Sequence, residues 1–284
     1  MGLMRIIAIV NQKGGTGKTT TAVNLSAALA RHSKKVLLID LDPQASSSYW
    51  FNCKKQGQGL LDVFLDERPI EDAMLQTSYD NLFILPASPL LVRVEKTLAT
   101  EVGSELILKH RVNELKQSWD YIIFDCPPNL GTLSLNALTA AQEVLIPVET
   151  RVMALHGLVQ LLNTIKLVQT RLNPKLKVCG VLPCRADFRN NHSKEVMAQL
   201  KSRFPNEALN TYIRENIKLA EASLHLKPIT DYDLNSHGSK DYQQLALEIL
   251  KQEPGFLSQE IESKIEEKTI HETVRPADPS PSLE

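Results

Sequence analysis

Residues 5–20 read Arg-Ile-Ile-Ala-Ile-Val-Asn-Gln-Lys-Gly-Gly-Thr-Gly-Lys-Thr-Thr, an apolar run that leads directly into a glycine-rich loop. The run predicts a buried strand over residues 6–10, and apolar residues at helical spacing predict a helix over 20–30. A loop between such a strand and helix binds phosphate well, because loop amides and the helix N-terminus both present N–H groups to an anion. The flanking elements disfavour the alternative, a plain glycine turn with a solvated lysine. This stretch therefore predicts a nucleotide-binding α/β domain.

The loop contains the side chains that nucleotide chemistry needs. Lys18 is predicted to reach the β- and γ-phosphates, and the Thr19 hydroxyl is predicted to ligate Mg²⁺. One position departs from the usual pattern, which has a glycine five residues before Gly17. Here Gln12 stands at that position and Lys13 follows it, so the loop entrance carries an additional charge. The predicted nucleotide-binding residues are Lys13, Gly14, Gly15, Thr16, Gly17, Lys18, Thr19 and Thr20.

The 284-residue chain has an ordinary globular composition, with 43% hydrophobic and 23% charged residues. No apolar run approaches the roughly 20 residues of a membrane span. The N-terminal residues lead into the first strand without a signal-peptide pattern, so we expect a cytoplasmic protein. A zinc or iron–sulfur site is not expected, because no CxxC pair occurs among Cys53, Cys126, Cys179 and Cys184.

The net charge of −1 is unevenly distributed along the chain. Residues 253–284 carry a net charge of −5, which leaves +4 on residues 1–252. The terminal stretch also contains proline and serine but few aromatic residues, a composition typical of mobile segments. We therefore expect one domain over residues 1–252 and an acidic C-terminal tail over residues 253–284.

Short apolar runs alternate with helical periodicity along the predicted domain. The expected strands are residues 6–10, 36–40, 82–85, 121–125, 143–147 and 178–182. The expected helices include residues 90–115, 155–172 and 193–203. This alternation predicts an α/β fold with a doubly wound, mostly parallel sheet and helices on both faces. Together with the glycine loop, it predicts a fold of the P-loop NTPase type. Ligands of such sheets bind beyond the carboxyl ends of the strands.

Three carboxylates follow two of the predicted strands. Asp40 and Asp42 lie within residues 36–44, at the end of a predicted strand, and their side chains point to one face of an extended chain because a single residue separates them. Asp125 lies within residues 121–128, at the end of another predicted strand. Near a triphosphate, such carboxylates can hold Mg²⁺ and orient the attacking water. Any one of them could instead cap a turn, but all three beside a glycine loop favour phosphoryl transfer.

The glycine loop and both carboxylate-bearing strand ends resemble the three sequence signatures of the ParA/MinD class of deviant Walker ATPases, and most of all the short Soj-like ParA proteins. The matching segments are residues 13–20, 38–44 and 124–128. The resemblance continues through residues 146–149, 154–158, 180–183, 191–195 and 219–223. It therefore covers roughly residues 4–252.

This resemblance implies a Mg²⁺-dependent ATP hydrolase. In the family, the lysine that corresponds to Lys13 crosses an ATP-sandwich homodimer to touch the partner's phosphates, and the residue at Gly14 lies where the two subunits pack closely. The implied catalytic residues are Lys13, Lys18 and Asp42, of which Asp42 positions the hydrolytic water. The implied metal ligands are Thr19, Asp40 and Asp125. A lysine that is fully paired only in the dimer makes ATP part of the interface, because loss of the γ-phosphate weakens that pairing.

Members of this family differ in what the dimer binds. ParA proteins bind DNA without sequence preference, MinD proteins bind membrane, and iron-protein relatives carry a cluster. The cysteines for a cluster are missing, and the acidic tail does not suit a membrane-binding helix, which needs a basic face. We therefore expect a nucleoid-associated ATPase for chromosome, plasmid or cargo segregation. Its ATP-bound homodimer would coat DNA, stay off the membrane, and be released when a ParB-like partner stimulates hydrolysis.

The DNA-contacting residues are predicted less directly. Between Arg185 and Lys218 there are seven basic and four acidic residues, a modest excess that also suits an ordinary solvated surface. The resemblance points to Arg189, Arg214 and Lys218 as DNA-contact positions. Two alternative functions stay open: a MinD-like membrane-associated positioning ATPase, and a P-loop amide ligase of the cobyrinate or dethiobiotin synthetase type.

Overall fold

The structure is a computed structural model that describes residues 4–53, 59–151 and 154–253. The chain divides into two compact units, Met1–Ala246 and Leu247–Glu284. The acidic tail predicted for residues 253–284 lies, apart from Glu253, outside the described residues. None of the described helices is both long and apolar enough to cross a membrane.

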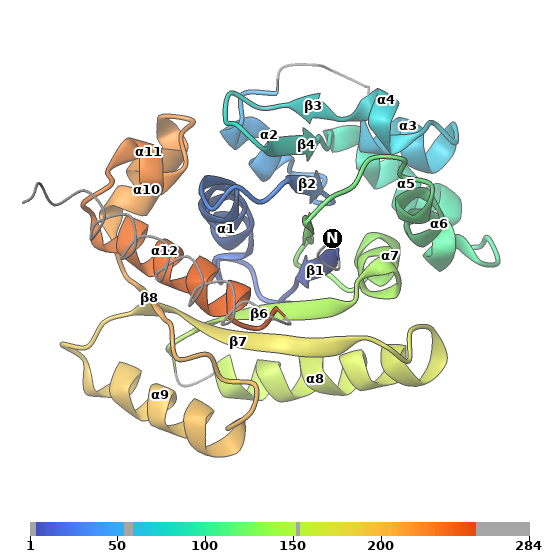
Figure 1. Cartoon of the computed structure of the whole chain (residues 1–284). Coiled ribbons are helices and arrows are strands. Elements are labelled where there is room, and N and C mark those ends of the chain that lie inside the picture. Colours follow the sequence, from blue (N-terminus) through green and yellow to red (C-terminus); the bar gives the residue numbers. More distant parts are fainter. Residues whose placement is uncertain (1–3, 54–58, 152–153, 254–284) are drawn as a thin grey trace, which may run out of the picture. The chain divides into compact units, whose positions relative to one another are not determined.

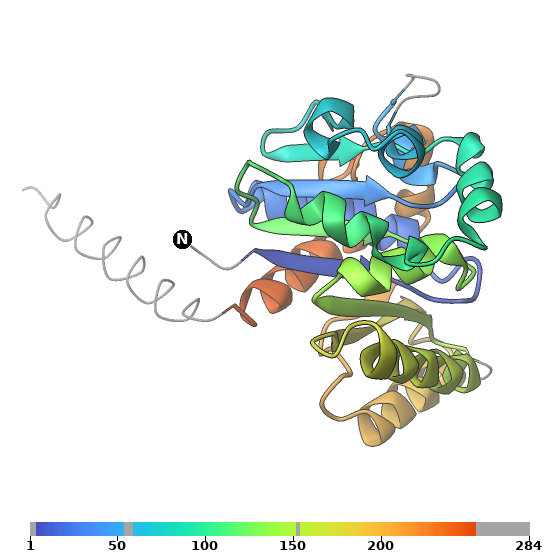
Figure 2. The ribbon, with the colours of Figure 1, turned by 90° about the vertical axis from the view of Figure 1, so that its right-hand side faces the viewer.

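An eight-stranded sheet forms the centre of the first unit, in the order β3-β4-β2-β5-β1-β6-β7-β8. Its strands are β1 (Arg5–Ile9), β2 (Val36–Asp40), β3 (Leu75–Gln76), β4 (Leu82–Leu85), β5 (Tyr121–Asp125), β6 (Glu143–Glu149), β7 (Lys177–Ala186) and β8 (Ile213–Arg214). Every neighbouring pair is parallel except β3 and β4. Figure 2 shows the longer strands stacked in this order, from blue β2 to olive β7. The predicted doubly wound, mostly parallel sheet is confirmed.

Helices cover both faces of this sheet. Figure 1 shows α1 on one side of β1 and α7 on the other. The helices are α1 (Lys18–Arg31), α2 (Ser46–Trp50), α3 (Leu60–Leu65), α4 (Ile70–Ala73), α5 (Val92–Leu98), α6 (Ile107–Asn113), α7 (Thr132–Ala140), α8 (Ala154–Arg171), α9 (Asn191–Arg203), α10 (Ile217–Leu224), α11 (Ile229–Tyr232) and α12 (His237–Leu250). Two short 3₁₀ turns, Pro89–Leu91 and Ser104–Leu106, precede α5 and α6.

The strands alternate their side chains between the two faces, as pleating requires. Ile6, Ala8 and Val10 belong to the same buried cluster as Leu133 and Ala137 of α7. All five residues of β1 are buried, and so are all five of β2 and of β5. Burial on both faces explains why these strands read as continuous apolar runs rather than as alternating patterns.

Two predictions about the elements need correction. The single helix predicted over residues 90–115 is wrong, because α5 ends at Leu98 and Gly103 adopts a left-handed backbone (φ 81°) that an α-helix cannot contain. The strands β6 and β7 also run further than predicted, to Glu149 and Ala186. These additional residues matter for the site, because they bring Glu149 and Arg185 to the edge where the glycine loop lies.

We predict that Gly59→Ala destabilises the protein more than Gly103→Ala does. Both glycines have positive φ, 132° and 81°, so alanine is strained at either position by about 1–3 kcal/mol. At Gly59 the new Cβ would also lie 2.5 Å from the carbonyl oxygen of Pro86, whereas at Gly103 nothing lies within 4 Å. Urea unfolding measures both losses. Equal losses would contradict the packing described for the start of α3.

Candidate nucleotide-binding site

The glycine loop joins β1 to α1 at the carboxyl edge of the sheet. Gly17 precedes the first turn of α1 with a left-handed backbone (φ 92°), and its carbonyl accepts a hydrogen bond from the Thr21 amide at 2.8 Å. Thr16 and Lys18 are buried, whereas Lys13, Gly14 and Gly15 are exposed. The Lys18 ammonium donates to the Lys13 carbonyl at 3.2 Å. The loop thus wraps around Lys18 and leaves its own outer rim open.

Two carboxylates lie side by side beneath this loop. Asp40 and Asp125 are register partners at the ends of β2 and β5, and both are fully buried. One oxygen of Asp40 accepts hydrogen bonds from the Ser48 amide (2.8 Å) and hydroxyl (2.7 Å). Asp125 Oδ2 accepts from the Ser47 hydroxyl at 2.6 Å. The other oxygen of Asp125 is buried and has no hydrogen-bond partner among the described residues.

Positive charge compensates these buried carboxylates only in part. Burial raises the pKa of Asp40, and the neighbouring charge of Asp125 raises it further. Burial also raises the pKa of Asp125, against which hydrogen bonds from Ser47 and Thr19 and the charge of Lys18 act to lower it. Burial in turn lowers the pKa of Lys18, the cation that opposes them. A divalent cation at this position would supply the missing charge.

The residues present fit Mg²⁺. Magnesium prefers carboxylate and hydroxyl oxygens, usually with several waters and substrate phosphates completing its shell. The unpaired Oδ1 of Asp125 is such an oxygen, and the Thr19 hydroxyl lies within hydrogen-bond reach of the same carboxylate. Asp42 is half-buried just beyond the end of β2, and its Oδ1 accepts from the Gln44 amide at 2.9 Å. The structure thus brings Thr19, Asp40, Asp42 and Asp125 together as the sequence predicts.

Lys13 occupies a different position from Lys18. Its ammonium pairs with Glu149 Oε2 at 2.8 Å, at the end of β6. The Lys13 side chain is 52% exposed, whereas that of Glu149 is only 4% exposed. Glu149 also accepts from Arg185 Nη1 at 3.1 Å. Lys13 is therefore paired with a carboxylate at the end of β6, and not with Asp40 or Asp125.

A cavity of about 610 Å³ opens beside the loop. Apolar and aromatic side chains form part of its wall, together with the polar side chains of Asn216 and Thr20, a mixture that suits a base and ribose. The residues that line it are Gly15, Gly17, Thr20, Trp50, Cys184, Arg185, Ile213, Arg214, Glu215, Asn216, Ile217, Leu219, Ala220, Ser223 and Tyr242. The sequence did not reveal this cavity, because its walls come from segments that are far apart in the chain.

Sequence reasoning also missed three side chains that shape the site. Ser47 and Ser48 follow the Asp42-Pro-Gln turn, so a serine run directly after a carboxylate pair was an available signal. Glu149 had only a weak signal, an acidic residue at the end of a buried apolar strand. Each of them became apparent only through its contacts in the structure.

The three predicted DNA-contact residues form ion pairs with other acidic residues than Asp40 and Asp125, and they differ in how exposed their side chains are. Arg189 has a side chain that is 89% exposed and is paired with Asp187 at 2.8 Å. Arg214 on β8 holds Asp241, a carboxylate that is only 8% exposed, through both its backbone amide and its guanidinium. Lys218 on α10 pairs with Glu221 at 2.8 Å. Arg214 thus has a structural contact that the sequence did not reveal.

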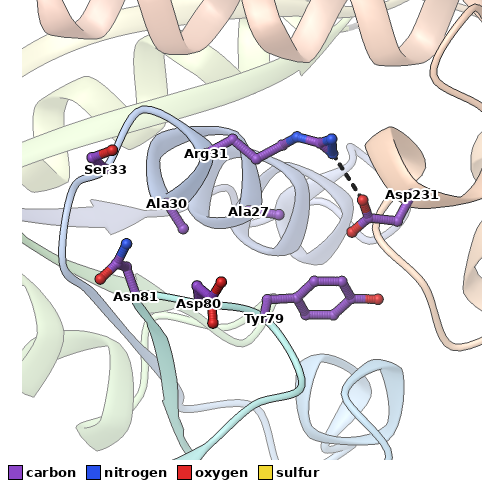
Figure 3. A pocket seen from close by; sticks show the side chains of 8 residues that line it. All are labelled: Ala27, Ala30, Arg31, Ser33, Tyr79, Asp80, Asn81 and Asp231. Carbon is purple, nitrogen blue, oxygen red and sulfur yellow. Dashed lines mark hydrogen bonds and ion pairs between the residues drawn. The ribbon is translucent and has the colours of Figure 1, made fainter.

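A second cavity, of about 370 Å³, lies at the other end of α1. Figure 3 shows Arg31 reaching across it to Asp231, with the Tyr79 ring beneath that ion pair. A helix of 14 residues is about 20 Å long. This cavity is therefore remote from the glycine loop and does not belong to the nucleotide site.

Comparisons with known proteins agree with this geometry. Residues 4–178 match the family model described as an AAA domain. The chain is 44% identical over 247 residues to the sporulation initiation inhibitor protein Soj of Bacillus subtilis, which covers 86% of this chain and 98% of Soj.

Two solved structures are similar to the fold. Cobyrinic acid a,c-diamide synthase from Mycobacterium smegmatis, with a bound ATP analogue and magnesium, has a TM-score of 0.74 and 33% identity, covering 86% of this chain and 93% of that one. The septum site-determining protein MinD from Pyrococcus horikoshii OT3, complexed with Mg-ADP, has a TM-score of 0.72 and 27% identity, covering 87% and 96%. The match to Soj over nearly its whole length, together with the glycine loop and the paired carboxylates, shows that the chain belongs to the Soj/ParA family of partitioning ATPases.

Proposed function

We propose that this chain is a Mg²⁺-dependent ATPase whose ATP-bound homodimer binds DNA without sequence preference and is released when a ParB-like partner stimulates hydrolysis. The observation that carries the proposal is the contrast between the two loop lysines. Lys18 is buried and interacts electrostatically with Asp125 and Asp42, whereas Lys13 is half-exposed and pairs with Glu149. One lysine thus serves the nucleotide of its own chain, and the other is available to a second subunit.

In this proposal each residue of the site has a distinct role. The loop amides and Lys18 bind the phosphates, while Thr19, Asp40 and Asp125 hold the metal shell. When bound, Mg²⁺ neutralises the charge on the β- and γ-phosphate oxygens. Asp42 accepts a hydrogen bond from the attacking water and orients it toward the γ-phosphate. The cavity between the loop and α10 takes the base and ribose.

The outer rim of the loop supports dimerisation. A Cβ added at Gly14 would meet nothing within 4 Å in this chain. The glycine is therefore not required by packing inside the monomer, and close approach of another molecule explains it better. Lys13 next to it would exchange Glu149 for the phosphates of the second subunit, so ATP would hold the two subunits together.

A second candidate function is an amide ligase, favoured by the likeness to cobyrinic acid a,c-diamide synthase. Such an enzyme activates a carboxylate with ATP and passes it to ammonia. ATP turnover measured with DNA and a ParB-like protein, and separately with cobyrinic acid and ammonia or glutamine, distinguishes the two functions. We expect that only DNA and the partner protein stimulate ATP turnover. If only the carboxylate and the nitrogen donor stimulate it, the amide-ligase function replaces the one proposed.

Co-sedimentation with anionic vesicles in ATP tests the MinD-like alternative, and no binding is expected.

We predict that Asp42→Ala still binds ATP, dimerises and remains on DNA but hydrolyses ATP about 100-fold or more slowly, because it removes the group that orients water. Phosphate release and sizing in ATP measure the two effects. Asp80→Ala, in the second cavity at the far end of α1, is the matched control and should hydrolyse normally. A variant that stays monomeric in ATP would contradict the role given to Asp42.

We predict that Gly14→Val folds and binds nucleotide but does not dimerise in ATP, because the new side chain occupies the space that a second subunit needs. Sedimentation velocity with ATP and with ADP measures this. Gly157→Val on α8 is the control, since that glycine also has open space around it. If Gly14→Val dimerises like the wild type, the open rim of the loop is not the interface.

We predict that Arg189→Ala mainly lowers DNA affinity, whereas Arg214→Ala mainly lowers the stability of the fold. Arg189→Ala should lower DNA affinity and reduce the slope of log affinity against log salt by roughly 1 for each phosphate that Arg189 neutralises, with little change in stability. Arg214→Ala should cost about 1–3 kcal/mol of stability, because it leaves the buried Asp241 without its guanidinium. DNA retention across a salt series and urea unfolding measure both. Unchanged DNA affinity of Arg189→Ala would remove that residue from the DNA surface.

A further inference from the structure

Arg185 has an unusual backbone near the end of β7. Its φ is +55°, in the left-handed region that residues with a Cβ seldom adopt. The pairing of β7 with β8 shifts register at this point, between Cys184 and Ala186. Such strain persists only where the surroundings fix it, and it often marks residues whose side chain must be placed in one direction.

The side chain of Arg185 bridges two acidic residues. Its Nη1 donates to Glu149 Oε1 and its Nη2 donates to Glu215 Oε1, both at 3.1 Å. Glu149 and Cys184 are register partners in the parallel pair β6–β7, so Arg185 follows directly after the residue opposite Glu149. Glu149 therefore has a cation on each of its oxygens, Lys13 on Oε2 and Arg185 on Oε1.

The two cations differ in how firmly they are held. Lys13 is attached to Glu149 by a single ammonium contact and is otherwise exposed. Arg185 is held at both ends of its guanidinium, by Glu149 and by Glu215. The charge of Arg151 also lowers the pKa of Glu149, by more than the charge of Arg185 does, but among the described residues the Arg151 side chain makes no hydrogen bond or ion pair with this carboxylate. Arg185 is thus the fixed partner of Glu149, and Lys13 is the one that can leave.

Departure of Lys13 has an electrostatic cost that depends on Arg185. A carboxylate that is only 4% exposed is strongly unfavourable without a charged partner. With Arg185 in place, Glu149 keeps one charge-assisted hydrogen bond after Lys13 has left. Without Arg185, Lys13 would be the only side chain that hydrogen-bonds this carboxylate among the described residues, and it would be held more tightly.

We propose that Arg185 is a positioning residue, which holds and neutralises Glu149 so that Lys13 can leave it for the phosphates of a second subunit. This inference rests on the proposed ATP-driven homodimer. Its first step, the freedom of Lys13 in the ligand-free monomer, does not depend on that dimer and can be measured alone.

The first experiment measures the acylation rate of the Lys13 amine by an N-hydroxysuccinimide ester, read by mass spectrometry relative to the exposed Lys166 of α8. In Arg185→Met the rate should fall by about two- to fivefold, which corresponds to a partly exposed ion pair. Arg185→Lys should restore most of the rate, and Glu149→Gln should raise it above wild type. In the double variant Arg185→Met/Glu149→Gln the rate should equal that of Glu149→Gln. An unchanged rate in Arg185→Met would overturn the inference.

The second experiment measures the dimer dissociation constant with a slowly hydrolysed ATP analogue by sedimentation velocity. Arg185 also lines the cavity beside the glycine loop, so each protein is compared at an analogue concentration that saturates its monomer. Under that condition Arg185→Met should dimerise several-fold more weakly than wild type. Arg185→Gly removes the same side chain and also relieves the left-handed strain, so it keeps the fold and should show the same loss. If wild type does not dimerise, the proposed function fails. If wild type and both variants dimerise equally, only the role of Arg185 fails.

Discussion

Asp40 and Asp125 are buried next to each other at the ends of two neighbouring parallel strands, and the nearby cation, Lys18, is itself buried. Two carboxylates in this position repel each other and lose their hydration, which is strongly unfavourable unless positive charge and hydrogen-bond donors surround them. The neighbouring elements supply donors accordingly. The serines of α2 donate hydrogen bonds to both carboxylates, and the glycine loop holds the Lys18 ammonium, whose charge acts on Asp125. The buried Oδ1 of Asp125 remains without a hydrogen-bond partner among the described residues, and we propose that a metal–nucleotide complex binds there.

Glu149 is a third buried carboxylate at this edge of the sheet, but its charge is compensated more fully than that of Asp40 and Asp125. Glu149 is as buried as a core residue, but it has two cations instead of too few. That surplus makes one of them replaceable. Lys13 is paired with Glu149 at rest, and its side chain is still exposed enough to move. In the mechanism that we propose, Lys13 has two alternative anionic partners: a carboxylate of its own chain, or a phosphate across the interface with a second subunit.

Much of the fold could be predicted from the sequence because its central strands are buried on both faces and end in carboxylates. The glycine loop, Asp40 and Asp125 were located by local pattern alone, since a strand, its turn and its following helix are neighbours in the chain. The prediction of one helix over residues 90–115 was wrong because apolar spacing does not reveal the left-handed turn at Gly103. Arg185 and its pairing with Glu149 were not predictable, because they depend on a register shift at the end of β7. Likewise, the contact between Arg214 and Asp241 joins residues 27 positions apart.

The most direct measurement of the central claim is the calorimetric affinity for ATP with and without Mg²⁺, in wild type and in Asp125→Asn. Because Asp40 and Asp125 have too little positive charge around them, we expect Mg²⁺ to strengthen ATP binding markedly in wild type. In Asp125→Asn, which removes one charge and one metal oxygen, most of this gain should disappear while binding of metal-free ATP persists. Equal Mg²⁺ dependence in the two proteins would contradict the assignment of the buried carboxylates to a metal–nucleotide site.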